Sequence, residues 1–262
     1  MIRPVARIGV LLPEGNITCE VEFPQLGQSE ASFHFQRLHR DGAALSAESL
    51  LTLHRGVDAA LAALRDTSPR AYVFACTSGT FLAGHDRHDD AAARIRAATG
   101  CPAITTASAL LQACSALTVR RLHMLAPYPD AITRQEAEFL AFHGVDASHY
   151  DTLECRDGNA IRGLDESTVY QRLMARADDA RRADAVFLSC TNMPTLGLIE
   201  ALEADLGVPV FSSNTATAWA GLRLAGVAGD TPAIGVLGRQ ALPERAHFST
   251  TFDTRNHDGR HP

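Results

Sequence analysis

The sequence predicts an α/β protein made of two pseudo-symmetric lobes, each holding a parallel sheet flanked by helices. Two observations lead to this fold class. Short apolar runs alternate with helical patterns along most of the 262 residues, which is typical of parallel strands buried on both faces. Segments of the first half also recur in the second half, in the same order and at a nearly constant offset. Such internal repetition indicates a duplicated structural unit.

Three pairs of segments carry the repetition. Ile8–Pro13 reads IGVLLP, and Leu122–Pro127, 114 positions later, reads LHMLAP. The same separation relates Cys76 to Cys190, each of which ends an apolar run and is followed by threonine. The third pair, at an offset of 107, is Gly100–Thr106 with Gly207–Ser213. The duplication therefore predicts one thiol at the end of a core strand in each lobe.

The remaining elements follow from the same patterns and set the lobe boundaries. We expect the first lobe in residues 1–117, completed by residues 212–262 because Ile234–Leu237 again reads IGVL, and the second lobe in residues 118–211. The expected strands are 8–12, 71–74, 103–105, 122–125, 185–188, 208–211 and 234–237. The expected helices are 48–65, 91–98, 108–117, 132–143, 167–182, 196–206 and 215–224.

Composition excludes several classes of function. A net charge of −6 without a basic patch argues against nucleic acid as a partner. No apolar stretch reaches the roughly 20 residues of a membrane span, so we expect no membrane association and a cytoplasmic location. The chain contains no lysine, which excludes pyridoxal phosphate enzymes and P-loop proteins. The six cysteines lack metal-site spacing, and we expect neither a metal nor a cofactor.

The two matched cysteines are the strongest candidates for chemistry. Ligands of parallel α/β sheets bind at the carboxyl ends of the strands, where Cys76 and Cys190 are expected. Thr77, Ser78 and Thr191 would begin the helices that follow the cysteines. Their backbone N–H groups would then attract an anion and lower the pKa values of the thiols toward neutrality. A lone cysteine in such a place is usually a structural thiol, but two at matched positions favour catalysis.

Three further residues are candidates for binding a substrate carboxylate. Asn16 follows the first strand and could equally be a helix cap. Tyr128, between two prolines, stands at the corresponding place in the second half, where a tyrosine in a surface turn would need no functional explanation. Asn159 reads as a loop residue, and its sequence context alone favours a turn.

Together these motifs resemble the aspartate/glutamate racemase superfamily, whose lobes are flavodoxin-like, and most closely its maleate cis-trans isomerases. Arylmalonate decarboxylases and ectoine-catabolism proteins are relatives. The resemblance rests on segments spread over nearly the whole chain: Arg7–Gly9, Pro13, Asn16, Thr18, Ala75–Cys76, Ala126–Tyr128, Ser189–Pro194, Leu206–Val210 and Ser213–Thr217. It implies that Cys76 is the nucleophile, that Cys190 is the opposing acid and base, and that Asn16, Tyr128 and Asn159 bind the substrate carboxylates.

The resemblance implies cofactor-independent isomerisation of a small dicarboxylate, by a protein that is either a monomer or a homo-oligomer.

The sequence departs from the isomerase pattern at two places, so other activities are also considered. Glu14–Gly15 replaces the small serine-type residues of the isomerases, and the segment after Cys76 is more polar than theirs. The alternatives are a two-cysteine racemase of an amino acid or hydantoin, a decarboxylase or ectoine-catabolism relative, and a binding protein whose cysteines only pack. Arylmalonate decarboxylases retain only the second cysteine, so the presence of both argues against that activity.

Overall fold

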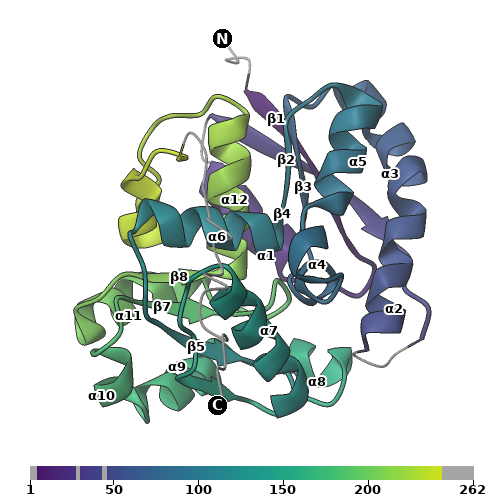
Figure 1. The fold of residues 1–262 in the computed structure, drawn as a ribbon. Helices are drawn as coiled ribbons and strands as arrows, with labels where there is room; N and C mark the ends of the chain where they lie inside the picture. Colours follow the sequence, from purple (N-terminus) through teal and green to yellow (C-terminus); the bar gives the residue numbers. More distant parts are fainter. Residues whose placement is uncertain (1–4, 28–29, 43–45, 244–262) are drawn as a thin grey trace, which may run out of the picture.

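Two four-stranded parallel sheets make up the protein and confirm the predicted fold class (Figure 1). The computed structural model describes residues 5–27, 30–42 and 46–243. The strand orders are β2-β1-β3-β4 and β6-β5-β7-β8, so the second sheet repeats the first with every strand number raised by four. The strands are β1 (Ala6–Pro13), β2 (Ala31–Leu38), β3 (Ala71–Phe74), β4 (Ala103–Thr105), β5 (Leu122–Ala126), β6 (Tyr150–Thr152), β7 (Ala185–Leu188) and β8 (Val210–Ser212).

Helices cover both faces of each sheet. The α-helices are α1 (Cys19–Gly27), α2 (Ala47–Leu51), α3 (Val57–Leu64), α4 (Ser78–Phe81), α5 (Asp90–Thr99), α6 (Thr106–Ala116), α7 (Asp130–Phe142), α8 (Gly158–Arg162), α9 (Glu166–Met174), α10 (Ala177–Ala180), α11 (Ile199–Leu206) and α12 (Ser213–Leu224). The 3₁₀ helices are η1 (Thr52–Gly56), η2 (Arg65–Thr67), η3 (His85–Arg87), η4 (Leu196–Leu198) and η5 (Pro232–Arg239).

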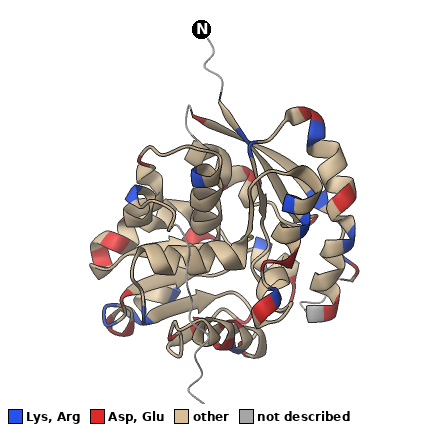
Figure 2. Ribbon diagram, turned by 45° about the horizontal axis from the view of Figure 1, so that its top comes forward, with Lys and Arg blue, Asp and Glu red and all other residues tan. Residues whose placement is uncertain are grey.

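The strands that carry the two cysteines lie inside their sheets and are buried throughout. All residues of β3 and β7 are buried, which explains why their sequences are apolar without alternation. Burying one such Phe or Val side chain stabilises the fold by about 1.5–3 kcal/mol. In Figure 2 the charged residues lie mainly on helices and loops, while the strands are largely uncharged. The residues that follow β3 and β7 are therefore held on rigid supports.

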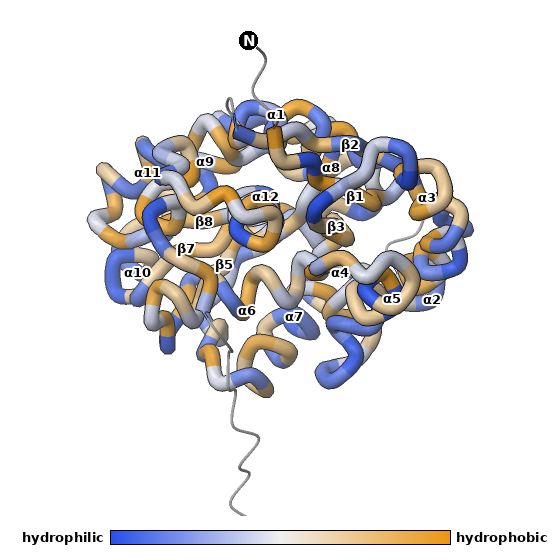
Figure 3. Tube along the Cα trace, turned by 90° about the horizontal axis from the view of Figure 1, so that it is seen from above, coloured by the Kyte–Doolittle hydropathy of each residue, from blue (hydrophilic) through white to orange (hydrophobic). Residues whose placement is uncertain are grey.

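Helix α12 connects the two lobes. It begins directly after β8 of the second sheet, yet it packs against α1, α6, β3 and β4 of the first, and Figure 3 shows it between the two groups of elements. A side-chain carbon at Gly221 would lie 2.8 Å from Cγ1 of Val73, so glycine allows the helix to lie directly on β3. Residues 244–262, which we also expected in the first lobe, lie outside the described residues.

The strand expected at Ile234–Leu237 is wrong. These residues belong to η5, which packs against α11 and β8. Pro232 favours the start of a helix, and Gly235 has a φ of 65°, outside the extended region. The carboxylate of Glu203 accepts a hydrogen bond from the Val236 N–H at 3.1 Å. In a strand, this N–H would instead bond to a neighbouring strand.

Strands β2 and β6 were not expected from the sequence. Both are edge strands, and they are only partly buried, with intermediate exposure at most positions of β2 and at both ends of β6. The apolar signal that identified the inner strands is therefore weak in them. None of the described helices is both long enough and apolar enough to span a membrane.

Candidate active site

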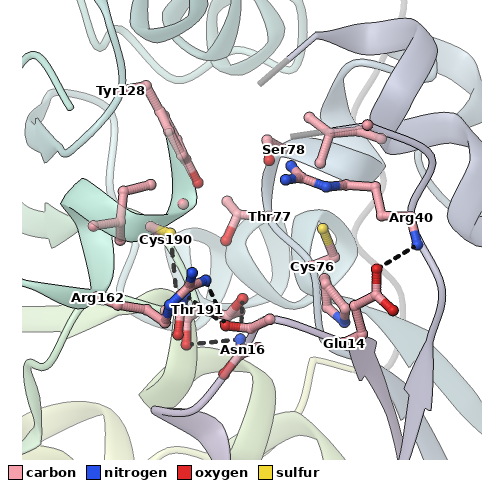
Figure 4. A pocket seen from close by; sticks show the side chains of 17 residues that line it. Glu14, Asn16, Arg40, Cys76, Thr77, Ser78, Tyr128, Arg162, Cys190 and Thr191 are labelled. Atoms are coloured by element: carbon pink, nitrogen blue, oxygen red, sulfur yellow. Dashed lines mark hydrogen bonds between the residues drawn. The ribbon is translucent and has the colours of Figure 1, made fainter. Parts of the chain in front are cut away.

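A pocket of about 430 Å³ opens where the carboxyl ends of both sheets meet (Figure 4). Both predicted cysteines line it, on opposite sides, as do the predicted residues Asn16, Thr77, Ser78, Tyr128 and Thr191. The other lining residues are Pro13, Glu14, Gly15, Arg40, Gly42, Leu50, Gly158, Ile161, Arg162 and Asn192. The pocket thus takes its walls from segments of both duplicated halves.

Cys76 follows β3 by two residues and is buried, with 4% of its surface exposed. Burial raises the pKa of its thiol to about 11, although a hydrogen bond from the Gly79 N–H, the positive charge of Arg40 and the Ser78 hydroxyl oppose this rise. The expectation of a pKa lowered toward neutrality is therefore wrong for Cys76. Helix α4 has only four residues, and desolvation outweighs its N–H groups.

Cys190 is held in an unusual backbone conformation directly after β7. Its φ is 93°, a region that non-glycine residues rarely adopt and that typically occurs at functional sites. The turn directs the N–H of Asn192 toward the Cys190 sulfur at 3.4 Å. No helix starts at Thr191 as expected, because the chain stays in a turn until η4 begins at Leu196.

Cys190 and Tyr128 influence each other's ionisation. Burial raises the pKa of the Cys190 thiol to about 12, while the hydrogen bond from the Tyr128 hydroxyl lowers it. Burial also raises the pKa of Tyr128 well above its usual value. Both groups are therefore protonated at neutral pH, and the phenol is placed to stabilise a thiolate on Cys190.

The two thiols have unequal electrostatic surroundings. The positive charge of Arg40 acts on Cys76 and lowers its pKa, whereas the groups that lower the pKa of Cys190 are neutral donors, the Tyr128 hydroxyl and the Asn192 N–H. The cation beside Cys76 therefore favours the thiolate form of that thiol. This asymmetry suits one nucleophile and one proton donor better than two equivalent bases.

A buried serine joins the two cysteine segments. The Ser213 hydroxyl accepts a hydrogen bond from the Thr77 hydroxyl at 2.9 Å and one from the Cys190 N–H at 3.0 Å. Ser213 is the first residue of α12 and is fully buried. The helix that links the lobes therefore also fixes the position of one thiol segment relative to the other.

The Asn16 amide also joins the lobes. Its Nδ2 donates to the carbonyl oxygen of Thr191 at 3.1 Å and to the Thr191 hydroxyl at 3.0 Å, while its Oδ1 accepts the Cys19 N–H at 3.0 Å. The capping role and the pocket position considered for Asn16 are therefore both present. In this arrangement its donors are already used, so a carboxylate would have to compete with Thr191.

Asn159 is not among the residues that line the pocket. It is exposed on α8, and its Oδ1 accepts a hydrogen bond from Nη2 of Arg162. Nη1 of Arg162 donates to the carbonyl oxygen of Gly15 at 3.1 Å, which places the guanidinium at the pocket in Figure 4. The helical turn of α8 thus brings Arg162, three residues later, to the wall where Asn159 was expected.

Three other charged residues, two that line the pocket and one that is buried behind it, had little signal in the sequence. Arg40 lies in a loop after β2, a strand that was not expected, so nothing in the sequence placed it near Cys76. Glu14 was noted only as a departure from the isomerase pattern. Glu136 lies at a buried position of α7, where one acidic residue among apolar neighbours was the only available signal.

The duplicated sheets, with one thiol from each half facing a shared pocket, define a two-lobed α/β protein with a candidate cysteine active site. Comparison with known families is more specific. The family model described as arylmalonate decarboxylase matches residues 8–237, and the chain belongs to this family.

Its relatives in the family include maleate isomerases. The chain is 29% identical over 246 residues to maleate isomerase of Nocardia farcinica, which covers 90% of this chain and 96% of the relative. It is 33% identical over 150 residues to arylmalonate decarboxylase of Bordetella bronchiseptica, which covers 57% and 62%. The second match therefore omits much of both chains.

Solved maleate isomerases share the whole fold. A Pseudomonas putida S16 maleate isomerase variant with maleate has a TM-score of 0.83 at 28% identity, covering 91% of this chain and 99% of that one. A cysteine-to-serine mutant of the Nocardia farcinica enzyme has a TM-score of 0.81 at 28% identity, covering 90% and 99%, and holds a covalently bound succinylcysteine intermediate.

Proposed function

We propose that this protein is a cofactor-independent isomerase that converts maleate to fumarate, with Cys76 as nucleophile and Cys190 as acid and base. The observation that carries the proposal is the pair of thiols on opposite sides of one pocket, in unequal electrostatic surroundings. The succinylcysteine found in the Nocardia farcinica relative is the adduct that addition of a thiolate to maleate would form.

The reaction needs a temporary loss of the double bond. Cys76 first gives its thiol proton to solvent. The resulting thiolate forms a bond to one alkene carbon, and the π electrons move toward the neighbouring carbon and its carboxylate. Cys190 donates its proton to that carbon, which leaves a single bond that can rotate. The Cys190 thiolate then removes the proton again, the double bond re-forms in the trans arrangement, and Cys76 leaves as thiolate.

Binding a dianion in a protein without lysine requires arginine and neutral donors. Arg162 lies on one wall and Arg40 on the other, and hydroxyls of Ser78 and Tyr128 add neutral donors. The Thr77 hydroxyl can add a third only if it gives up its hydrogen bond to Ser213. Asn16 and Thr191 can join if a carboxylate displaces their mutual hydrogen bonds. Asn159 can contribute only after its side chain leaves Arg162.

The test separates the two thiols. Wild-type protein incubated with maleate in deuterated water should form fumarate, and NMR measures its appearance. Cys76→Ser should abolish turnover because an alcohol is a much weaker acid than a thiol and its hydroxyl is a much weaker nucleophile than a thiolate. Cys190→Ser should still form the adduct, so mass spectrometry should show a maleate-sized mass increase on the peptide that contains Cys76.

A two-base racemase would behave differently. Both serine variants would then be equally inactive, neither would retain an adduct, and the wild type would exchange the α-proton of a chiral amino acid or hydantoin with solvent. That combination of results would overturn the isomerase proposal. Release of carbon dioxide from an arylmalonate by the wild type would instead assign the decarboxylase activity of the other relatives.

The proposed reaction also suggests the partners and the location of the enzyme. Its partner is a small carboxylate substrate, and we expect it to act in the cytoplasm without nucleic acid or membrane. Assembly into a homo-oligomer can be tested by light scattering, where a mass near 28.1 kDa would show a monomer.

A further inference from the structure

Glu136 is a buried acid that the proposed reaction does not use. It projects from α7 and has no exposed surface, and the same is true of its hydrogen-bond partner Ser189. The Ser189 hydroxyl lies 2.9 Å from Oε1 and 2.8 Å from Oε2. Ser189 immediately precedes Cys190, so the carboxyl is placed directly behind the thiol segment.

The geometry favours a protonated carboxyl. One serine hydroxyl carries a single hydrogen and cannot satisfy both oxygens of a carboxylate, whereas a carboxylic acid can donate its own hydrogen to the serine oxygen. Burial accordingly raises the pKa of Glu136 to about 8, and the hydrogen bond from Ser189 opposes this only in part. The Glu136 carboxyl therefore begins to lose its proton as the pH approaches 8.

The groups around Glu136 are the ones involved in the reaction. Its charge acts on both Cys190 and Tyr128 and raises their pKa values. Helix α7 also packs against α4, which carries no charged residue, and against β6. The acid of β6, Asp151, is paired with Arg172 at 3.3 Å. The histidines that pack against α7, His85 and His88, contact its Phe139. Cys190 and Tyr128 are the groups of the described structure whose pKa values Glu136 raises.

We propose that Glu136 is a positioning residue that stays protonated during turnover and thereby allows Cys190 to pass through its thiolate form. This inference rests on the isomerase proposal, in which Cys190 becomes a thiolate each time it gives its proton to the substrate. An ionised Glu136 would place a second negative charge behind that thiolate in a site of low dielectric constant. A protonated Glu136 keeps the position neutral while still holding Ser189.

The first experiment compares Glu136→Gln with wild type across pH. Glutamine has a similar shape and cannot ionise, so the ratio of its kcat to that of wild type should be constant below pH 7. Above pH 8 the ratio should rise several-fold, because only the wild type then carries the Glu136 charge that raises the pKa of Cys190. Glu138→Gln makes the same change on the exposed face of α7 and should give a ratio that does not change with pH. A constant ratio for Glu136→Gln, or inactivity at every pH, would overturn the proposal.

The second experiment needs no substrate and so separates failure of this inference from failure of the isomerase assignment. In a Cys76→Ser background, iodoacetamide alkylation of Cys190 is followed by mass spectrometry of its peptide. Adding Glu136→Gln should leave the alkylation rate unchanged below pH 7 and increase it several-fold above pH 8. An equal effect at all pH values would indicate a purely structural role for Glu136 and refute the proposal, whether or not maleate is isomerised.

Discussion

The Glu136→Gln substitution should stabilise the protein, by an amount that depends on pH. A carboxyl whose pKa is raised on folding contributes stability below its unfolded pKa and loses it as pH rises. For Glu136 the loss extends from the ordinary pKa of 4.5 to the folded value of about 8. Since one pKa unit corresponds to about 1.4 kcal/mol, the loss is about 3 kcal/mol at pH 7 and about 5 kcal/mol above pH 8.

Urea unfolding at pH 5 and pH 8 measures this difference. At pH 5 the free energies of unfolding of wild type and Glu136→Gln should agree within about 1 kcal/mol. At pH 8 the variant should be more stable by several kcal/mol, seen as a higher midpoint with an unchanged slope. Glu138→Gln should show no such divergence, because its side chain is exposed. A stability difference for Glu136→Gln that is the same at both pH values would refute the reasoning.

Two further substitutions test the pocket. Gly79→Ala would place a carbon 2.8 Å from the sulfur of Cys76, and the displaced thiol should lower kcat/KM for maleate by about tenfold or more. Urea unfolding should show a loss of stability of about 1–3 kcal/mol. An unchanged kcat/KM would contradict the assigned role of Cys76. Arg162→Met removes a positive charge from the pocket and should raise KM for maleate about tenfold with a smaller change in kcat, measured by initial rates. Arg181→Met, at the exposed residue that follows α10, should leave both constants unchanged. A KM for Arg162→Met equal to that of the wild type would contradict a role for Arg162 in substrate binding.

The sequence predicted the parts of the fold that burial alone determines. The inner strands β3 and β7 are covered on both faces, so their apolar runs were sufficient to identify them and to locate Cys76 and Cys190. The edge strand β2 is half exposed, and the loop that carries Arg40 follows it, so both were missed together. Ile234–Leu237 shows the opposite error, because an apolar run can also pack as a 3₁₀ helix when proline fixes φ at its start and glycine allows a positive φ within it.

The electrostatics of the site could not be predicted because they depend on contacts between distant segments. Desolvation of Cys76 outweighs the N–H groups of a helix whose short length was not evident from the sequence. The contact between Ser189 and Glu136 joins residues 53 positions apart. Asn159 was placed by resemblance alone, and the turn of α8 directs Arg162 to the pocket instead.

The position of α12 determines when the protein can become active during its synthesis. The ribosome completes both cysteine segments before it reaches Ser213, whose hydroxyl holds the Thr77 segment and the Cys190 segment together. Until α12 emerges, the nascent chain also leaves uncovered the surface of β3 and β4 on which this helix packs. The two reactive thiols are thus brought into register only once more than four-fifths of the chain has been made, and a prematurely terminated product would carry both cysteines without an assembled site.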